Sequence, residues 1–495
     1  MRSETVTSRM LIDGEFTDSA GAATLDVVDP YTGDVWAEIP RAVPDDVDRA
    51  VAAARRAFEH GPWSRSSPGY REGCMRRLAD LIEQEADRLG ELDTRDNGKL
   101  LRETSKQARL AAATYRYYAS LTDKIYGSVI PLEDITTFDY VVYEPYGVCA
   151  LLVAWNSPMQ LLANKMAPAL AAGNTVVVKP SEHASVSVLQ LAKLVQKAGF
   201  PPGVVNIVSG LGSEAGAALT AHHDVDLISL TGGPATGRQV LRAASDSLAK
   251  VVLELGGKSP QVVFPDADLD AAVNGVLAGV FAATGQTCIA GSRLLVHQDV
   301  FEEVVGRVAQ RADAVKVGDP MQPDTQMGPL ANQLQFDRVA GLVEKGIANG
   351  GQLVTNAEYL DKAAGELFIR PVVFTGLDRD ATLVREEVFG PVLVALPFTD
   401  ESEAVALCND TSGGLAAGVW TNDVTRAIRM AQRLRVGTVW VNTYRKLASA
   451  APFGGVGRSG IGRERGLEGL REYVQSKNVM MATEIRIDDP FTIRT

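Results

Sequence analysis

The stretch that decides the fold is residues 148–182, VCALLVAWNSPMQLLANKMAPALAAGNTVVVKPSE. It begins with an apolar run at 148–154, continues with a helical pattern at about 158–172, and ends with a valine-rich run at 174–178. Two apolar strands joined by a helix predict neighbouring parallel strands with the helix packed against the sheet.

The same alternation continues on the C-terminal side of this unit. Short connections between strands and helices predict a parallel sheet with helices on both faces, and such a sheet binds its ligand at the carboxyl ends of the strands. A second alternating block begins near Pro260 and runs to about residue 470, so the fold class is α/β with two such domains. In the first block we expect strands at 204–208, 226–231 and 250–254 and helices at about 184–199, 213–221 and 235–247.

Before residue 148, strands come first and helices follow. A helical pattern opens at Pro44, and more helices are expected across 68–122. A segment rich in strand formers, 137–146, then leads into the parallel sheet. The early strands are expected at 10–16, 24–30 and 35–40.

Composition and charge narrow the classes of function. With 495 residues the chain is too long for one compact core, so more than one domain is expected. Apolar residues make up 46% and charged residues 22%, as in soluble globular proteins. The formal net charge of -12 argues against a surface for nucleic acid or an anionic membrane. Neither a signal-peptide core nor a run of about 18 apolar residues is found, so a cytoplasmic protein is expected.

Neither the cysteines nor the histidines form a metal-binding pattern. The 4 cysteines are scattered without a CxxC pair, which fits a reducing compartment and offers no disulfide framework. The 5 histidines show no ligand spacing, and the adjacent rings of His222 and His223 are expected to point apart. No metal site is therefore predicted.

One thiol has the features of a nucleophile. Cys288 stands in GQTCIAGSR at 285–293, where no packing role explains a cysteine. By contrast, Cys74, Cys149 and Cys408 are interpreted as small buried hydrophobes.

A carboxylate that could serve as a base precedes this thiol. Glu254 ends the apolar strand 250–254, where burial is unfavourable unless the charge has a function. A thiol and a base together suggest covalent catalysis. The oxyanion that forms needs donors, and the Asn156 side chain offers one beside the backbone N–H of Cys288. The alternative role for Asn156 is a helix cap before Pro158.

These segments resemble the aldehyde dehydrogenase superfamily, in its NAD(P)-dependent hydrolytic form, over nearly the whole chain. Several motifs occur in the order of the family, so chance agreement is negligible. They are AWN (154–156), KPSE (179–182), LTGGPATG (230–237), LELGGKSP (253–260), GQTCIAGSR (285–293), EEVFGP (386–391), WVNTY (440–444) and PFGGVGRSGIGRE (452–464).

The resemblance implies a three-part subunit. The dinucleotide-binding domain would comprise 1–123 and 146–257, and the catalytic domain with the nucleophilic cysteine would comprise 258–473. The remaining segments, 124–145 and 474–495, would form a small β element for oligomerisation. A homodimer or a homotetramer is expected on this basis.

Two loops fit a dinucleotide cofactor. Lys179 and Glu182 follow a strand end and can both reach a ribose, and the charge of Glu182 would repel a 2′-phosphate, so NAD is favoured over NADP. The strand 226–231 runs through glycines into a helix whose free N–H groups would seat the pyrophosphate. The alternatives are an ordinary solvated loop at 179–182 and a competing glycine run at 210–216, which we interpret as turn glycines that start a helix. The predicted cofactor-binding residues are Trp155, Lys179, Glu182, Thr231, Gly232, Gly233, Gly237, Leu255, Glu387 and Phe389.

The resemblance also implies the chemistry. Cys288 would attack the aldehyde, and Glu254 would activate the water that hydrolyses the thioester. Asn156 and Lys179 complete the predicted catalytic set. Because Glu254 is present, release of a free acid is favoured over transfer to coenzyme A.

Some positions match the family and others depart from it. Glu387 and Phe389 match positions that hold the nicotinamide ribose and ring, although EEVFGP alone would be a surface turn. Gly233 stands where a serine often meets phosphate, so one hydroxyl contact is missing. Gly413-Gly414 and Gly457-Arg458 also depart from the common pattern.

The substrate-facing residues indicate a polar aldehyde. Ser157, Gln160 and Asn164 share one helix face, for which a solvated surface is the alternative. Arg445 can pair with a substrate carboxylate, so a polar or anionic aldehyde such as a semialdehyde is predicted. An apolar aliphatic or aromatic aldehyde is the alternative. The predicted substrate residues are Ser157, Gln160, Asn164, Thr287, Ile289, Arg445 and Phe453.

Two rival classes of function were weighed against this one. A cofactor-independent thiol hydrolase would need a histidine partner, and none of the 5 histidines shares a motif with Cys288. A structural or binding protein on a borrowed fold would have no use for Cys288, Glu254, Asn156 and Lys179 together. Oxidation of an aldehyde therefore explains more of the sequence than either rival.

Overall fold

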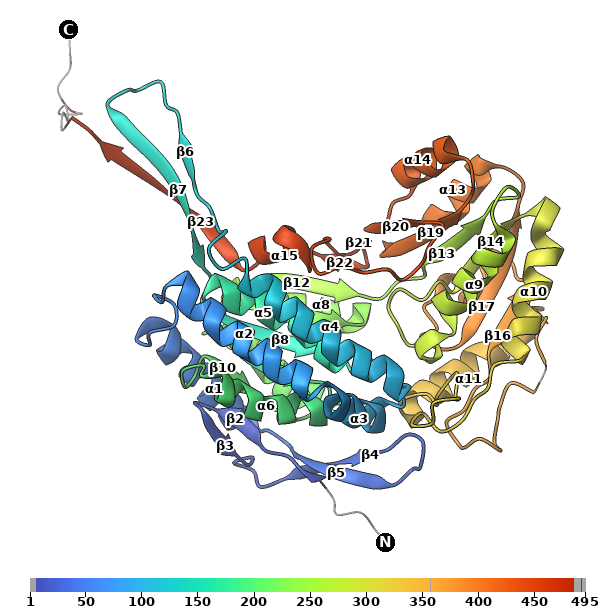
Figure 1. Ribbon diagram of the computed structural model, residues 1–495, viewed down its shortest axis with the longest axis horizontal. Coiled ribbons are helices and arrows are strands. Elements are labelled where there is room, and N and C mark those ends of the chain that lie inside the picture. Colours follow the sequence, from blue (N-terminus) through green and yellow to red (C-terminus); the bar gives the residue numbers. More distant parts are fainter. Residues whose placement is uncertain (1–5, 357, 485–490, 492–495) are drawn as a thin grey trace.

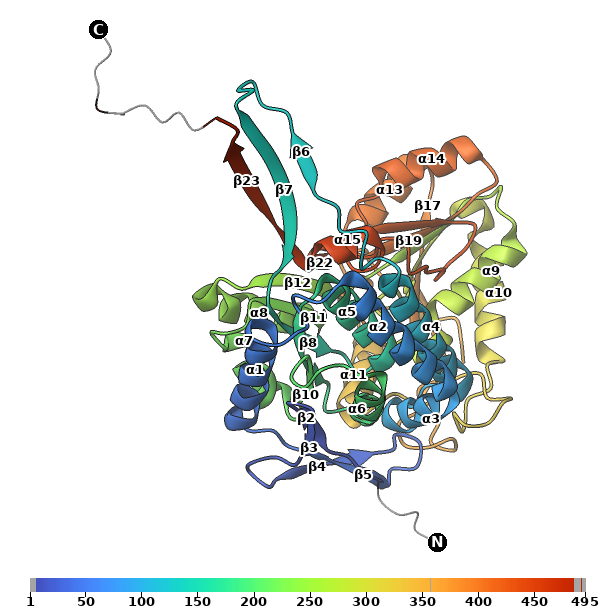
Figure 2. The same ribbon diagram turned by 60° about the vertical axis from the view of Figure 1, so that its left-hand side comes forward.

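The computed structural model describes residues 6–356, 358–484 and 491. One mainly parallel sheet with helices on its faces forms the N-terminal part of the body, and a second such sheet forms the C-terminal part (Figures 1 and 2). A narrow β-arm projects from the body. This architecture confirms the predicted α/β class.

The first sheet has the strand order β22-β12-β11-β8-β9-β10-β2-β3. Neighbours from β12 to β10 are parallel, whereas the strands at the two edges run antiparallel. The predicted elements of this block are confirmed to within two residues at each end. They are β8 (Val148–Val153), α5 (Pro158–Ala172), β9 (Thr175–Pro180), α6 (Val186–Ala198), β10 (Val205–Ile207), a π-helical turn (Gly212–Gly216), α7 (Ala217–Ala221), β11 (Leu227–Gly232), α8 (Pro234–Ser247) and β12 (Lys250–Leu255).

Helix α5 shows why the sequence sets these boundaries so clearly. Pro158 occupies its first turn, where the missing N–H costs no helical hydrogen bond. Gly173 ends it with φ 97, a left-handed conformation that glycine adopts without strain. Between these ends nearly every residue is buried, because the helix is covered by α2, α4 and the sheet.

The N-terminal segment contains one corrected prediction. The single strand expected at 10–16 is wrong, because Asp13 (φ 54) and Gly14 (φ 81) form a turn that splits it into β2 and β3. The strands expected at 24–30 and 35–40 are confirmed, as are the helices after Pro44. The elements are β1 (Val6–Thr7), β2 (Met10–Ile12), β3 (Glu15–Thr17), β4 (Thr24–Val28), β5 (Val35–Pro40), α1 (Pro44–Glu59), α2 (Pro68–Gln84), α3 (Ala86–Asn97) and α4 (Leu101–Ala119).

The second sheet has the strand order β15-β16-β17-β14-β13-β19-β20 and is parallel except at β15. It confirms the second alternating block expected after Pro260. Its elements are β13 (Pro260–Val263), α9 (Leu269–Val280), β14 (Arg293–His297), α10 (Phe301–Asp313), α11 (Gln333–Ala348), β15 (Gln352–Leu353), β16 (Val372–Thr375), α12 (Thr382–Arg385), β17 (Val392–Phe398), α13 (Glu401–Asn409), β19 (Ala416–Trp420), α14 (Val424–Arg433) and β20 (Thr438–Val441).

The last part of the chain returns to the first sheet. Strand β21 (Val456–Gly457) pairs with β18 (Gly413–Gly414). Strand β22 (Gly460–Ile461) then adds to the edge of β12, and α15 (Gly466–Arg471) packs against α5. The segment from β21 to α15 therefore lies along the junction of the two parts of the body.

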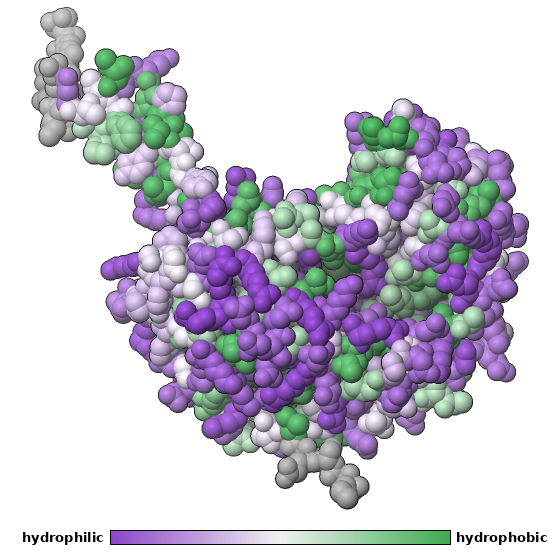
Figure 3. Space-filling model, viewed as in Figure 1, coloured by the Kyte–Doolittle hydropathy of each residue, from purple (hydrophilic) through white to green (hydrophobic). Residues whose placement is uncertain are grey.

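The β-arm joins two distant segments of the sequence. Strand β7 (Thr137–Pro145) lies between β6 (Ser128–Ile130) and β23 (Val474–Ala482), and all pairs are antiparallel. The strand expected at 137–146 is thus confirmed. Apolar side chains gather on the arm above a mostly hydrophilic body (Figure 3), among them exposed Val129, Ile135, Met480 and Met481.

The prediction that the rings of His222 and His223 point apart is wrong. They stack with centroids 4.9 Å apart, because His222 leaves α7 in an extended conformation (φ -71, ψ 128). With Asp224 their ligand atoms lie within 4.8 Å of one another. The Nδ1 of His222 accepts the N–H of Asp224 at 3.1 Å, and its Nε2 lies 3.4 Å from an oxygen of Asp48.

Within the described residues, no helix is long and apolar enough to cross a membrane.

Candidate active site

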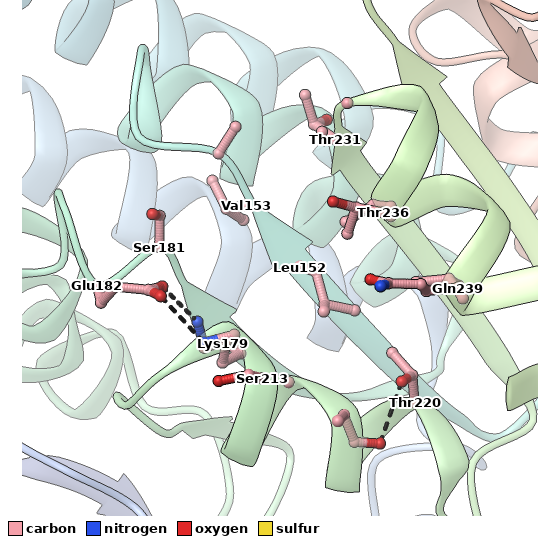
Figure 4. A pocket seen from close by; sticks show the side chains of 18 of the residues that line it. Leu152, Val153, Lys179, Ser181, Glu182, Ser213, Thr220, Thr231, Thr236 and Gln239 are labelled. Carbon is pink, nitrogen blue, oxygen red and sulfur yellow. Dashed lines mark hydrogen bonds and ion pairs between the residues drawn. The ribbon is translucent and has the colours of Figure 1, made fainter. Parts of the chain in front are cut away.

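A cavity of about 780 Å³ opens at the carboxyl ends of β8, β9 and β11 (Figure 4). The π-helical turn and α7 form one wall, and the first turns of α8 form the opposite wall. This is the position that a parallel sheet offers to a ligand. The predicted cofactor residues that line it are Trp155, Lys179, Glu182, Thr231, Gly232 and Gly233.

A paired charge lies in one wall of this cavity. The Nζ of Lys179 donates to Glu182 Oε2 at 3.1 Å, and the backbone N–H of Gly212 donates to Glu182 Oε1 at 3.1 Å. Burial opposes ionisation of Glu182, but the Lys179 charge and these donors hold its pKa below the usual value. Gly212 begins a helical turn, as expected of the 210–216 run, and it also lines the cavity.

The opposite wall is open and polar. Helix α8 begins after Gly233, which has no side chain to cap the free N–H groups of the first turn. A Cβ added at Gly233 would meet nothing within 4 Å. The Thr231 hydroxyl is buried without a hydrogen-bond partner among the described residues. Free donors at a helix start are suited to an anionic group such as pyrophosphate.

Gly237 and Leu255, two of the predicted cofactor residues, pack against each other behind this wall. A Cβ at Gly237 would lie 2.9 Å from the Leu255 side chain, so glycine permits α8 to approach β12 closely. Neither residue lines the cavity itself.

The other two predicted cofactor residues come from the second part of the body. The N–H of Gly257 donates to Glu387 Oε1 at 3.2 Å, and burial raises the pKa of Glu387 to about 7. Phe389 has φ 58 and its ring packs edge-on against Trp155, with centroids 5.3 Å apart. The EEVFGP run is therefore a contact between the two parts, not a surface turn.

Two side chains that the sequence reasoning missed hold this run in place. Gln335 Nε2 donates to the carbonyl of Phe389 at 2.7 Å, and Arg338 donates to the carbonyl of Glu387 at 2.6 Å. Both lie on the first turns of α11, where the sequence shows only an amphipathic helix.

The loop that carries Cys288 is fixed on several sides. The Asn156 side chain donates to the carbonyl of Gln286 at 3.0 Å, and Tyr444 Oη donates to the carbonyl of Ile289 at 3.0 Å. A Cβ at Gly285 (φ 69) would lie 2.0 Å from the Gly390 carbonyl, so glycine is required there. The Asn156 side chain thus reaches the Cys288 loop across the junction of the two parts.

Cys288 and Glu254 lie in one electrostatic environment. Burial, then the charge of Glu254 and that of Glu387, raise the pKa of the half-buried Cys288 thiol to about 12. Burial and Glu464 raise the pKa of Glu254 well above its usual value. Glu254 is 4% exposed, and neither of its carboxyl oxygens has a hydrogen-bond partner within the described chain. Such a carboxyl is free to exchange a proton with a bound reactant or water.

The polar face of α5 is buried, which rules out the solvated alternative. Gln160 Nε2 donates to Asn164 Oδ1 at 3.0 Å, and Asn164 Nδ2 donates to Glu464 Oε2 at 3.2 Å. Glu464 forms a fully buried ion pair with Lys165 at 2.6 Å. The Ser157 hydroxyl accepts hydrogen bonds from two side chains earlier in the chain, Lys99 at 2.8 Å and Gln107 at 3.2 Å.

Of the remaining predicted substrate residues, Thr287 and Ile289 flank the half-buried Cys288 and are themselves buried. Phe453 is buried near the junction, where its backbone pairs with Glu464. Arg445 (φ 59) donates to the carbonyls of Ala278 and Ala282, so part of its guanidinium already binds the chain.

Lys99 was not predicted from the sequence. It is 3% exposed, and burial lowers its pKa to about 8 while the charges of Glu103 and Cys288 favour its ionised form. Nothing in its local sequence indicates this position, because the segment that carries it reads as a helix end followed by a turn.

The model of the aldehyde dehydrogenase family matches residues 16–479. The chain belongs to the aldehyde dehydrogenase family. Among curated relatives, a (Z)-2-((N-methylformamido)methylene)-5-hydroxybutyrolactone dehydrogenase from Acinetobacter baylyi is 45% identical over 98% of this chain and 99% of its own length. The NADP/NAD-dependent aldehyde dehydrogenase PuuC from Escherichia coli is 42% identical over 97% of this chain and 96% of its own length.

Solved structures of aldehyde dehydrogenases confirm the fold. The NAD+ complex of an aldehyde dehydrogenase from Bacillus cereus has a TM-score of 0.94 and 42% sequence identity, and it covers 97% of each chain. The protein is therefore an enzyme with the aldehyde dehydrogenase fold.

The residues of this aldehyde dehydrogenase fit a dinucleotide. The cavity offers a carboxylate for ribose hydroxyls, an open helix start for phosphates and an unpartnered hydroxyl at Thr231. Trp155 lines the cavity and contacts Phe389, and the next residue, Asn156, donates to the loop that carries Cys288.

Proposed function

We propose that this aldehyde dehydrogenase oxidises an aldehyde to the free carboxylic acid with NAD, through a covalent intermediate on Cys288. The observation that supports this most is that the Cys288 thiol and the Glu254 carboxyl lie in the same electrostatic environment. The buried Glu254 carboxyl has no partner among the described residues, and its charge raises the pKa of the Cys288 thiol. The neighbour of Glu254 on the adjacent strand, Thr231, lines a cofactor-sized cavity.

The first step joins Cys288 to the substrate. The thiol gives its proton to solvent water and its sulfur adds to the aldehyde carbon, so a C–S bond forms and the carbonyl electron pair moves to oxygen. The Asn156 amide, held 3.0 Å from the Gln286 carbonyl, and the backbone N–H of Cys288 are the donors for that oxyanion.

The second step is hydride loss from the tetrahedral carbon, which leaves a thioester on Cys288. NAD, when bound, supplies the hydride acceptor. Trp155 lines the cavity and packs against Phe389, and a carboxyl oxygen of Glu387 accepts the Gly257 N–H.

The third step releases the product. Glu254 takes a proton from water, whose oxygen attacks the thioester carbon, and the C–S bond breaks to give the carboxylic acid and the free thiol. Its raised pKa makes the ionised form of Glu254 a stronger base than an ordinary carboxylate. This base favours hydrolysis over transfer to coenzyme A.

We propose NAD in preference to NADP because the Glu182 carboxylate, paired with Lys179, occupies the wall where a ribose would bind. A polar or anionic aldehyde is the proposed substrate, since Gln160 and Asn164 are buried rather than solvated. We also propose that the β-arm, with its exposed apolar side chains, joins subunits of a homodimer or homotetramer.

The experiment is the initial rate of NADH formation at 340 nm with alkyl, aromatic, amino and semialdehyde substrates. NAD and NADP are each supplied to the wild type, to Cys288→Ala and to Cys408→Ala. Cys408 is a buried thiol of the second part, so its variant controls for loss of a cysteine as such.

Turnover that Cys288→Ala abolishes and Cys408→Ala retains is the expected result. Turnover that survives Cys288→Ala would refute the covalent mechanism. Failure of every aldehyde with both cofactors would refute the proposed oxidation of these aldehydes with NAD.

A further inference from the structure

Arg465 has an environment that the proposed mechanism does not explain. It is 8% exposed, and its Nε has no hydrogen-bond partner among the described residues. Its guanidinium lies 5.9 Å from the centre of the Phe453 ring rather than on a carboxylate. A buried cation without hydrogen bonds is unfavourable unless a ligand completes it.

The backbone of Arg465 is also held in an unusual conformation. Its φ of 61 and ψ of 168 belong to a region that residues with a side chain rarely adopt. The neighbours fix it there, because Gly466 N–H donates to the Ser449 carbonyl at 2.8 Å and Glu464 N–H donates to the Phe453 carbonyl at 2.7 Å. Strain maintained at one side chain is a mark of a functional position.

The charges around Arg465 leave its positive charge uncompensated. Burial lowers its pKa, while Glu464, Tyr118, Cys288 and Glu254 act in the opposite direction. Glu464 is already bound to Lys165 at 2.6 Å. Burial and the charge of Glu464 raise the pKa of Glu254. The guanidinium therefore lies within electrostatic reach of Cys288 and Glu254, yet among the described residues it forms no ion pair with a carboxylate.

The other cations around the nucleophile are already occupied. Arg445 and Arg463 each donate to two backbone carbonyls at 2.8 to 3.2 Å. Lys99 donates to the Ser157 hydroxyl at 2.8 Å. Arg465 differs from these three side chains, because its buried Nε has no hydrogen-bond partner among the described residues.

We propose that Arg465 binds a carboxylate at the far end of the aldehyde substrate, which makes the substrate an oxo-acid. A guanidinium presents parallel donors that match the two oxygens of a carboxylate. The Phe453 ring covers one face of the guanidinium, so the ligand meets its edge. This inference rests on the proposed aldehyde oxidation and names its substrate class.

The test compares oxo-acids with neutral aldehydes of matched length. Initial rates are measured for 4-oxobutanoate, 5-oxopentanoate and 6-oxohexanoate and compared with those for butanal, pentanal and hexanal. Glyceraldehyde 3-phosphate is included to test whether the site prefers a phosphate to a carboxylate. Wild type, Arg465→Leu, Arg465→Lys and Arg445→Leu are compared, and circular dichroism with thermal unfolding checks that each variant is folded.

In the wild type, one of the oxo-acids is expected to exceed its alkanal in kcat/KM. Arg465→Leu is expected to lower kcat/KM for that oxo-acid about 100-fold, since a charge-assisted bidentate contact is lost, and to change the alkanals less than about threefold. Arg465→Lys should recover part of the loss, and Arg445→Leu should have the smaller effect on oxo-acids.

Several results would overturn the inference. Equal losses for oxo-acids and alkanals would show that Arg465 acts on Cys288 or on folding. A larger effect in Arg445→Leu, a preference for the phosphate, or alkanals that surpass every oxo-acid in the wild type would each refute it. In all of these cases aldehyde oxidation itself, the proposed function, would stand.

A second measurement does not depend on turnover. Succinate and butyrate are compared for their ability to protect Cys288 from alkylation by iodoacetamide, followed by mass spectrometry of the peptide. Succinate should protect the wild type more strongly than butyrate does, and this advantage should disappear in Arg465→Leu. Equal protection by the two acids would contradict a carboxylate site at Arg465, even if no aldehyde were oxidised and the proposed function had failed.

Discussion

The proposed cofactor cavity and the proposed reaction centre around Cys288 differ in how their buried charges are partnered. In the cavity, Lys179 and Glu182 are paired at 3.1 Å, and Glu182 accepts a further backbone donor. At the reaction centre, the oxygens of Glu254 and the Nε of Arg465 have no partners among the described residues.

The pKa values follow this difference. Pairing keeps the pKa of Glu182 low in spite of its burial, so its charge is present before any ligand binds. At Glu254 and Cys288 burial raises the pKa, so the protonation state can change when reactants arrive. A preformed binding site needs fixed charge, whereas proton transfer needs groups whose charge is not fixed.

The largest effect is predicted for a substitution of Glu254. Replacing it by glutamine keeps its size and removes the base, so kcat should fall by about 10³ because the thioester is no longer hydrolysed efficiently. Stopped-flow absorbance should show a burst of NADH before a slow steady state. Glu401→Gln, which removes an acid paired with Arg429 in the second part, is the control. A variant that keeps full steady-state turnover would exclude Glu254 as the base.

A second prediction concerns how the reactivity of the Cys288 thiol depends on pH. With the pKa of Cys288 at about 12, the thiolate fraction in the free enzyme should rise about tenfold per pH unit, hence about 100-fold from pH 7 to pH 9. The rate of iodoacetamide modification of the Cys288 peptide measures this. A small thiol with an ordinary pKa, treated in parallel, should level off near pH 9. A plateau for Cys288 below pH 9 would show that its pKa is not raised.

Much of the cavity could be predicted from the sequence, because it is built from local features. Strand ends followed by KPSE and by a glycine-rich helix start place Lys179, Glu182 and Gly233 at one edge of the sheet, and the structure lines the cavity with them. The bounds of α5 were predicted for the same reason, since Pro158 and Gly173 mark them directly.

The reaction centre was predictable only in part. Cys288 and Glu254 stand out because their residue types do not fit their surroundings. Arg465 and Lys99 gave no such signal, because their burial arises from contacts with segments far away in the sequence. The pairing of β22 with β12 was equally hidden, since two residues are too few for any periodicity.

In the cavity, the charge of Glu182 should govern the choice of cofactor. Glu182→Gln is expected to lower the KM for NADP about tenfold, because a charge that repels the 2′-phosphate is removed. Initial rates with each cofactor measure the ratio. Glu214→Gln is a suitable control, since Glu214 belongs to the neighbouring turn but pairs with Arg41. An unchanged NAD-to-NADP ratio would show that Glu182 does not contact the ribose.

The smallest effect is expected at Gly233. Its φ of -82 and ψ of 159 suit any residue, and the space beside it is open, so Gly233→Ser should cap α8 and lower the Kd for NAD about threefold. Quenching of intrinsic fluorescence by NAD measures the Kd. Gly237→Ser, whose Cβ would meet Leu255 at 2.9 Å, should weaken binding instead. Tighter binding in both variants would mean that the gain does not come from the helix start.

The return of the C-terminal segment to the first sheet has a consequence for biosynthesis. Strand β22 covers the edge of β12, and β23 pairs along all of β7, although each partner emerges from the ribosome about 200 residues or more earlier. At ordinary rates of translation this delay lasts about 10 to 40 s or longer, during which both edges lack their partners. Glu464, Arg465 and Phe453 arrive in the same late segment. A nascent chain would therefore assemble its cofactor cavity long before it completes the environment of its nucleophile.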